Sequence, residues 1–247
     1  MPAHRDGPVS SNVRRPMETP AAFNRYKNAV AKLEGFCLEQ ATAAIVDGKK
    51  TEQVIAVVTS TLILGFHEIE HALERLELLE SLFSAPPPIS DRIPNNTYLN
   101  FLIGAHLQEI YILEQRLSTY AKKVSRAYKR NFNGDELSSS VRNQLEQVIK
   151  IRGEHVHSAR FTDRRLDLIA GISMMGDFAI QLGINAEAKY AEVQSEWQQR
   201  ILKINSEVSK LLSNYFTIML TAITTDQQIV LPRIGRNTAP LTIALDA

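Results

Sequence analysis

The residue types best suited to phosphate chemistry gather in one short segment. Arg152, His155 and His157 lie within six positions of one another, with Glu154 between them. Histidine exchanges protons near neutral pH, and arginine matches two oxygens of a phosphate at once. Metal-free cleavage of RNA requires a group that takes the 2′-hydroxyl proton, a group that protonates the leaving oxygen, and positive charge beside the phosphate. The segment therefore predicts a metal-independent ribonuclease, with no cofactor.

The position of Arg152 in its expected helix is unusual. It continues an apolar stripe formed by Val141, Leu145 and Val148. Burying a guanidinium is costly unless it is paired or faces a wet cleft. Gly153 is expected to loosen the helix, which places the segment at the junction of two helices. The alternative interpretation is that the arginine and the two histidines only cap and pin this junction.

Charge is unevenly distributed around the segment. The chain has 28 basic and 27 acidic side chains, a formal net charge of +1. Residues 116–165 hold 12 basic and 5 acidic residues, a net +7 that leaves −6 for the remainder. A basic stretch with interleaved aromatic residues is typical of binding to a phosphate backbone, although a solvated basic helix face is the alternative. The candidate RNA-binding residues are Arg126, Lys129, Arg130, Lys150, His155, Arg160, Arg164 and Arg165.

The string RGEHVHSARFTDRRLDLI, preceded by EIYILEQRL, resembles a bacterial subgroup of the HEPN superfamily of helical-bundle proteins. The marker of that superfamily is an arginine, four to six residues and a histidine, which Arg152 and His157 match with four residues between them. The resemblance spans about residues 50–180.

The resemblance implies a homodimer in which two motifs form one cleft. Arg152 would hold the phosphate and His157 would transfer protons, so that these two are the candidate catalytic residues. It also implies a toxin or defence setting, in which an antitoxin partner is possible but unidentified. Gly153 stands where active members usually have a polar residue, so cleavage and a non-catalytic RNA-binding role both stay open.

Helical periodicity dominates the elements that must position these residues. Thr19 is expected to cap the first helix, with Pro20 at its first position, and Asn133-Gly134 is expected to end the third. The expected helices run from Pro20 to Asp47, Thr51 to Pro86, Thr97 to Asn133, Ser138 to Arg152, Asp163 to Gly183 and Asn185 to Ala222.

These elements predict an all-α, elongated up-and-down bundle of about six helices. We expect a disordered arm over residues 1–18, a single HEPN-like domain over 19–225 and an irregular or short extended tail over 226–247, in which Ile229–Leu231 and Leu241–Ile243 are extended pieces or a hairpin. Three of the helices exceed about 30 residues, or ~50 Å, and such rods favour packing in a dimer. A non-catalytic interaction or scaffold protein is therefore the second functional hypothesis.

Other histidines offer weaker alternatives. His67-Glu68-Ile69-Glu70-His71 matches the zinc-hydrolase pattern His-Glu-x-x-His, but its surroundings lack the expected strands, and a solvated helix face explains it equally well. His106 lies on an apolar stripe and is expected to be a hydrogen-bonded core residue.

The sequence also bears on localisation. The first 20 residues contain no apolar run of the kind found in secretory signals, and the apolar stretch Val54–Phe66 is too short for a membrane span. Cys37 is the only cysteine, which excludes an intrachain disulfide and a cysteine-rich zinc site. A cytoplasmic protein without a membrane partner is the expectation.

Overall fold

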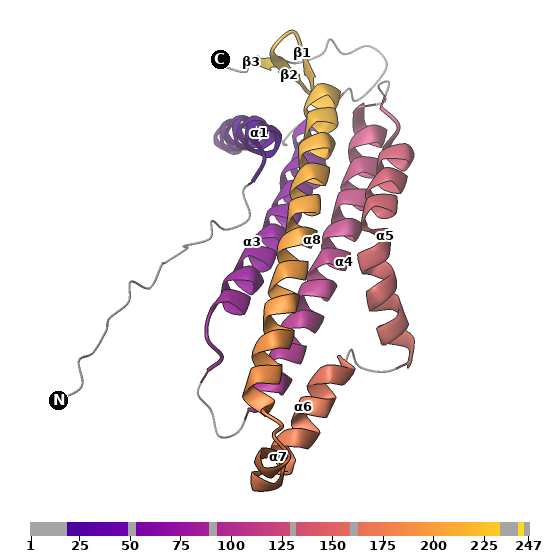
Figure 1. The fold of residues 1–247 in the computed structure, drawn as a ribbon. Helices are drawn as coiled ribbons and strands as arrows, with labels where there is room; N and C mark the ends of the chain where they lie inside the picture. The colour runs from indigo at the N-terminus through magenta and orange to yellow at the C-terminus, as the bar shows by residue number, and fades with distance from the viewer. Residues whose placement is uncertain are drawn as a thin grey trace, which may run out of the picture.

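The computed structural model describes residues 19–48, 53–88, 93–128, 132–158, 163–232 and 242–244, and it leaves out the side chains of residues 151–158 and 180. In these residues the chain is an all-α bundle with a small sheet (Figure 1). Its helical elements are α1 Ala21–Val46, α2 Gln53–Val58, the π-helical turn η1 Thr59–Ile63, α3 Leu64–Ser84, α4 Asn95–Tyr128, α5 Gly134–Ser158, α6 Arg164–Met174, α7 Asp177–Gln181 and α8 Ala186–Ile223.

Three long helices, α3, α4 and α8, run lengthwise together, and α1 crosses them near one end. Helix α5 packs on the outside of α4, while α6 and α7 form the opposite end of the bundle (Figure 1). The apolar stripes predicted from the sequence are the buried faces of these helices, as the seams Ile55 to Leu76 and Leu99 to Val124 illustrate. The all-α bundle is therefore confirmed.

Several helix boundaries differ from the prediction. Pro20 adopts an extended conformation and precedes the first helix, which begins at Ala21. Helix α4 ends at Tyr128, and Asn133 begins the next helix instead of ending the previous one. The Asn133 side chain accepts hydrogen bonds from the backbone amides of Asp135 (3.0 Å) and Glu136 (3.3 Å), as an N-cap does.

The end of α5 and the segment after it also correct the prediction. Helix α5 runs through Gly153 to Ser158, so this glycine does not end the helical backbone. Glycine costs a helix only about 1 kcal/mol relative to alanine, which neighbouring hydrogen bonds readily offset. The expected helix from Asp163 to Gly183 is divided in two at Gly176, whose φ of +52° favours glycine.

Residues 224–230 and 242–244 form a small three-stranded antiparallel sheet, so the described part of the tail contains short extended pieces, one of the two expected forms. Strand β1 (Thr224–Thr225) turns through Asp226 and Gln227, both at positive φ, into β2 (Gln228–Val230), which pairs with β3 (Thr242–Ala244). Ile229 is completely buried against the bundle. The pairing of β2 with β3 agrees with the hairpin that was one of the expected forms of these segments. Strand β1 was not expected.

A polar layer divides the apolar core into two clusters. His106 Nε2 donates to Asn205 Oδ1 (3.0 Å), and Asn205 Nδ2 donates to Glu80 Oε2 (2.6 Å). All three side chains are buried, and burial lowers the pKa of His106. The layer joins α3, α4 and α8, and it confirms the prediction that His106 is a hydrogen-bonded core residue.

A tight approach between helices lies at Tyr120. Its hydroxyl donates to the carbonyl of Leu62 (3.1 Å) in the π-helical turn and contacts the hydroxyl of Tyr26 at 2.8 Å. Its ring rests on Gly65, where a Cβ would lie 2.7 Å from Cδ2 of the tyrosine. Helices α1, α3 and α4 are thereby fixed to one another at a single side chain.

One helix in the described part of the chain, Gln53–Ser84, is long and apolar enough to cross a membrane on length and composition alone, with a mean hydropathy of 1.2. Core helices meet the same criteria. A third of its most apolar window is buried in the bundle, where the buried side chains pack against α1, α4 and α8.

The contact between Gly65 and Tyr120 gives the first prediction. Gly65→Ala should lower the free energy of unfolding by about 1–3 kcal/mol, because the buried ring must shift to admit the methyl group. Gly104→Ala is the matched control: it lies within α4, has no atom within 4 Å of an added Cβ, and should be neutral or stabilising by up to ~1 kcal/mol. Urea unfolding followed by circular dichroism measures both. Equal stability of the two variants would contradict the tight packing.

Candidate nucleic-acid interface

The predicted catalytic residues lie in the last two turns of α5. The helical backbone includes positions 152, 155 and 157, but their side chains lie outside the described residues, as do Lys129, Arg130 and Arg160 entirely. Their predicted roles stay predictions. At 3.6 residues per turn, positions 152 and 155 fall on one side of a helix and position 157 lies about 140° around it from 152. A continuous helix therefore separates the arginine from the histidine of the motif.

Burial decreases along α5 toward the motif. Leu137, Val141 and Leu145 are buried against the bundle, whereas Val148 and Ile149 are only half-buried and Lys150 is exposed. Helix α5 is thus anchored by its first half. The part that carries the motif follows the point where its apolar seam weakens.

Asp163 fixes the chain on the other side of the motif, where α6 begins. Its carboxylate accepts hydrogen bonds from the Arg165 amide (2.9 Å), Nε (3.1 Å) and Nη2 (2.8 Å), and from Trp197 Nε1 (2.9 Å). Its own amide donates to Asn100 Oδ1 at 3.3 Å. The Arg165 guanidinium lowers the pKa of Asp163 to about 2. The carboxylate of Asp163 therefore ties α6 to α8, and its backbone amide ties the same residue to α4.

The described basic residues of segment 116–165 divide into two groups. Four form ion pairs: Arg116 with Glu68 (3.6 Å), Lys122 with Asp135 (3.5 Å), Lys150 with Glu146 (2.9 Å) and Arg165 with Asp163 (2.8 Å). The others are exposed and have no ionic partner in the described part of the chain: Lys123, Arg126, Arg142 and Arg164.

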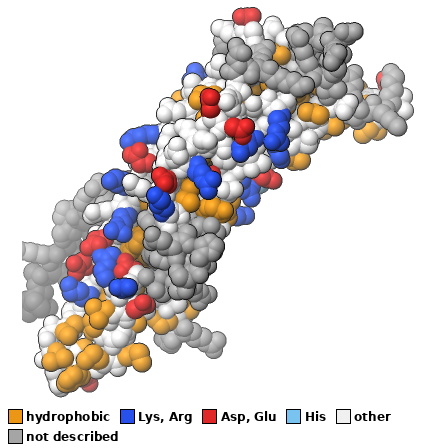
Figure 2. Space-filling view, turned by 90° about the vertical axis from the view of Figure 1, so that its right-hand side faces the viewer, with side chains coloured by type: hydrophobic (Ala, Val, Ile, Leu, Met, Phe, Trp, Pro, Cys, Tyr) orange, Lys and Arg blue, Asp and Glu red, His pale blue; other side chains and the backbone are white. Residues whose placement is uncertain are grey.

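This division refines the RNA-binding prediction. The charge of Arg165 is offset by Asp163 and also by Glu196, and that of Lys150 by Glu146. Arg126 and Arg164 keep a full charge available to a ligand. Figure 2 shows lysine and arginine side chains along this face, with acidic side chains among them. This face therefore carries separate cationic side chains with acidic ones among them, and it does not form a continuous basic patch.

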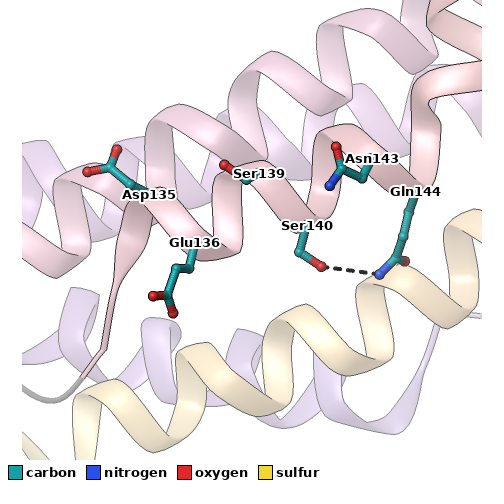
Figure 3. A pocket seen from close by; sticks show the side chains of 6 residues that line it. All are labelled: Asp135, Glu136, Ser139, Ser140, Asn143 and Gln144. Atoms are coloured by element: carbon teal, nitrogen blue, oxygen red, sulfur yellow. Dashed lines mark hydrogen bonds between the residues drawn. The ribbon is translucent and has the colours of Figure 1, made fainter.

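A pocket of about 590 Å³ lies on the first half of α5, away from the motif. Its lining was not anticipated from the sequence and consists of Asp135, Glu136, Ser139, Ser140, Asn143 and Gln144 (Figure 3). Two carboxylates at one end disfavour a phosphate backbone, since like charges repel. The two carboxylates therefore make the first turn of α5 an unfavourable place for a phosphate group.

The alternative zinc site gains no support from the geometry. His67 Nδ1 lies 2.9 Å from Glu70 Oε2, and His71 Nδ1 lies 3.1 Å from Glu74 Oε2, so each imidazole faces the glutamate three residues on. Glu68 instead approaches Arg116 on α4. Across the described residues no group of three or more histidine, cysteine or acidic side chains is placed to hold a metal ion. The solvated, ion-paired helix face is the better interpretation.

Comparison with known proteins does not assign a family to this chain. No protein-family model, no curated protein and no solved structure matches the chain.

Asp163 gives a prediction with a defined pH dependence. The folded-state pKa of about 2 lies below the ordinary value of about 3.9, so its stabilisation is complete above about pH 4 and is lost as the pH falls toward 2. Asp163→Asn should lower the free energy of unfolding at pH 7 by about 1–2 kcal/mol. The difference from the unmodified protein should shrink below pH 4. Urea unfolding at several pH values measures this.

Asp167→Asn is the matched control, because Asp167 is an exposed carboxylate in the first turn of the same helix. Its substitution should change stability by no more than about 0.5 kcal/mol. A loss equal to that of Asp163→Asn would mean that helix-end charge, and not the specific hydrogen bonds of Asp163, stabilises this junction.

Proposed function

We propose that the chain is an RNA-binding protein that acts as a homodimer and cleaves RNA without a metal ion, through Arg152 and His157. The observation that carries the proposal is the group of exposed cations without ionic partners in the described part of segment 116–165: Lys123 and Arg126 near the end of α4, Arg142 on α5 and Arg164 at the start of α6. A cation that is already paired must lose its partner before it binds a phosphate. An unpaired one gains the phosphate contact and releases counterions at no such cost.

The proposed dimer follows from the spacing of the motif. On a continuous helix, one copy of α5 presents Arg152 and His157 on different sides. A cleft that contains both groups is completed most simply by the arginine of one protomer and the histidine of the other. This arrangement agrees with the composite cleft that the HEPN resemblance implies, and it gives each dimer two equivalent pairs.

In the proposed reaction, His157 takes the proton of the 2′-hydroxyl as that oxygen attacks the phosphorus, and the resulting imidazolium gives the proton to the 5′-oxygen as its bond to phosphorus breaks. Arg152 neutralises the developing charge on the phosphate. The proposal places the protein in the cytoplasm, where RNA is available, in a toxin or defence role. A scaffold without catalytic activity is the second candidate, because α4 and α8 span 34 and 38 residues and offer long surfaces for assembly.

RNA binding is tested with the unpaired arginines. Arg126→Ala and Arg142→Ala should each weaken binding to a fluorescent single-stranded RNA, and each should reduce the slope of log K against log salt by up to ~1. Arg25→Ala is the matched control, since Arg25 is an exposed arginine of α1 outside the basic segment. Fluorescence anisotropy at several salt concentrations measures all three. Equal losses in the three variants would indicate nonspecific attraction and contradict a defined interface.

Catalysis is tested separately on the motif. The purified protein should cleave a mixed RNA pool in the presence of EDTA, and Arg152→Ala and His157→Ala should each reduce the rate at least ~100-fold while leaving the fold intact. Mixing the two inactive variants should restore part of the activity, because one of the two composite sites then contains both native residues. An intact RNA pool with the unmodified dimer would exclude the enzyme. Binding without cleavage would leave the non-catalytic role.

A further inference from the structure

The polar layer of His106, Asn205 and Glu80 lies where the apolar core changes from one cluster to the other. On α8, for example, Asn205 stands between Ile201 of one cluster and Val208 of the other. The smaller cluster fills the end of the bundle that carries α6 (Figure 1), and we call it the distal cluster. Its buried members are Leu79, Phe83, Leu99, Leu102, Ile103, Leu107, Leu166, Ile169, Val193, Trp197 and Ile201. The layer is therefore a boundary between two apolar units that share the same long helices.

The hydrogen bonds of the layer are complete when His106 is neutral and carries its one proton on Nε2. A carboxylate oxygen accepts, so the Asn205 atom that lies 2.6 Å from Glu80 Oε2 is the amide nitrogen. The amide oxygen of Asn205 then accepts from His106 Nε2 at 3.0 Å. A second proton would place a charge on a ring that is 1% exposed and lies edge-on to Phe83. Because a buried charge without an ionic partner is costly, protonation favours a state in which His106 reaches water.

In the described part of the chain, no charged side chain forms an ion pair with His106. From α8 the facing side chain is the neutral amide of Asn205, and its neighbours on that face, Ile201 and Val208, are buried and apolar. From α3, Glu80 is joined to His106 through Asn205. Burial is therefore the dominant influence on the ring, and it lowers the pKa of His106.

The other charged groups near the layer are paired or act in the opposite direction. On α4, Glu109 lies one turn beyond His106 and pairs with Arg75 of α3 at 3.4 Å. On α3, Glu77 lies one turn before Glu80, and burial raises the pKa of Glu77. A raised carboxylate pKa means that protonation of Glu77 favours the folded state. Acid acting on Glu77 therefore does not open the layer.

The sign of the pH effect follows from the buried histidine. The pKa of His106 in the folded state lies below the ordinary value of about 6.5, so below that pH an opened chain binds more protons than the closed one. The stability of the layer is then complete above about pH 6.5 and decreases as the pH falls below it. Asp163, at the same end of the bundle, keeps its stabilising charge until the pH falls toward 2. The two effects occupy separate pH ranges.

We propose that the polar layer is a pH-sensitive joint, at which the distal end of the bundle opens as a unit when His106 binds a proton. Helix α6 belongs to this unit, because Leu166 and Ile169 are members of the distal cluster. Opening separates α6 from α4 and α8, while the larger cluster keeps the rest of the bundle folded. Mild acid thus releases α6 without unfolding the chain. The proposal does not depend on RNA binding or cleavage.

Hydrogen exchange of the full-length protein between pH 5 and 7.5, corrected for the intrinsic exchange rates, tests this opening. Amides of α6 and of residues 99–107 and 193–201 should exchange through one common opening, and amides of residues 110–124 and 208–219 should stay at least ~10-fold better protected at every pH. The open population of the distal unit should rise by up to ~10-fold per pH unit below about pH 6.5, because opening takes up one proton.

Substitutions and a direct titration identify the responsible group. His106→Gln keeps an amide donor for Asn205 and removes the titrating ring, so the distal amides should lose their pH dependence. His71→Gln is the matched control, since the His71 side chain is 67% exposed on α3, and it should leave that dependence unchanged. NMR titration of the unmodified protein should give His106 a pKa below the ordinary value of about 6.5, whether or not the variants fold.

Three outcomes would overturn the proposal. The first is that distal and core amides exchange with equal protection at every pH, which would mean that the bundle opens only by unfolding completely. The second is that His106 titrates at or above its ordinary pKa, as it would if it were paired with Glu80. The third is that the distal opening of the His106→Gln variant keeps the pH dependence of the unmodified protein, which would assign the effect to another group.

Discussion

The close approach of Tyr120 to Gly65 is the constraint on which the rest of the bundle depends. The Tyr120 hydroxyl reaches Leu62 and Tyr26, so α4 is registered against the π-helical turn and against α1. One residue further along α4, the carbonyl of Ala121 would lie 2.6 Å from a Cβ at position 134, so only glycine lets α5 begin there. The start of α5 is therefore set by the same segment of α4. The start of α5 also sets the position of the motif along the bundle, because position 152 lies five helical turns beyond position 134.

The described chain is anchored on both sides of the motif. Gly134 sets the start of α5, and Asp163 sets the start of α6 through Arg165, Trp197 and Asn100. Between these two anchors the burial of α5 decreases after Leu145. The chain on either side of the motif is therefore fixed to the bundle, at Gly134 and at Asp163.

The sequence predicted the all-α fold, but it did not show how the charged side chains pair, for physical reasons. Apolar side chains repeat with the helical period, so the seams of α3, α4 and α8 were readable, as was the hydrogen-bonded His106. Asn133-Gly134 was predicted to end a helix, but the same pair can also begin the next one. The close contact of Gly134 with Ala121, which the sequence does not show, favours the second role. The net charge of +7 hid the pairing of Arg116 with Glu68 and of Arg165 with Glu196, residues far apart in the sequence. Ion pairing of this kind is a property of the tertiary structure.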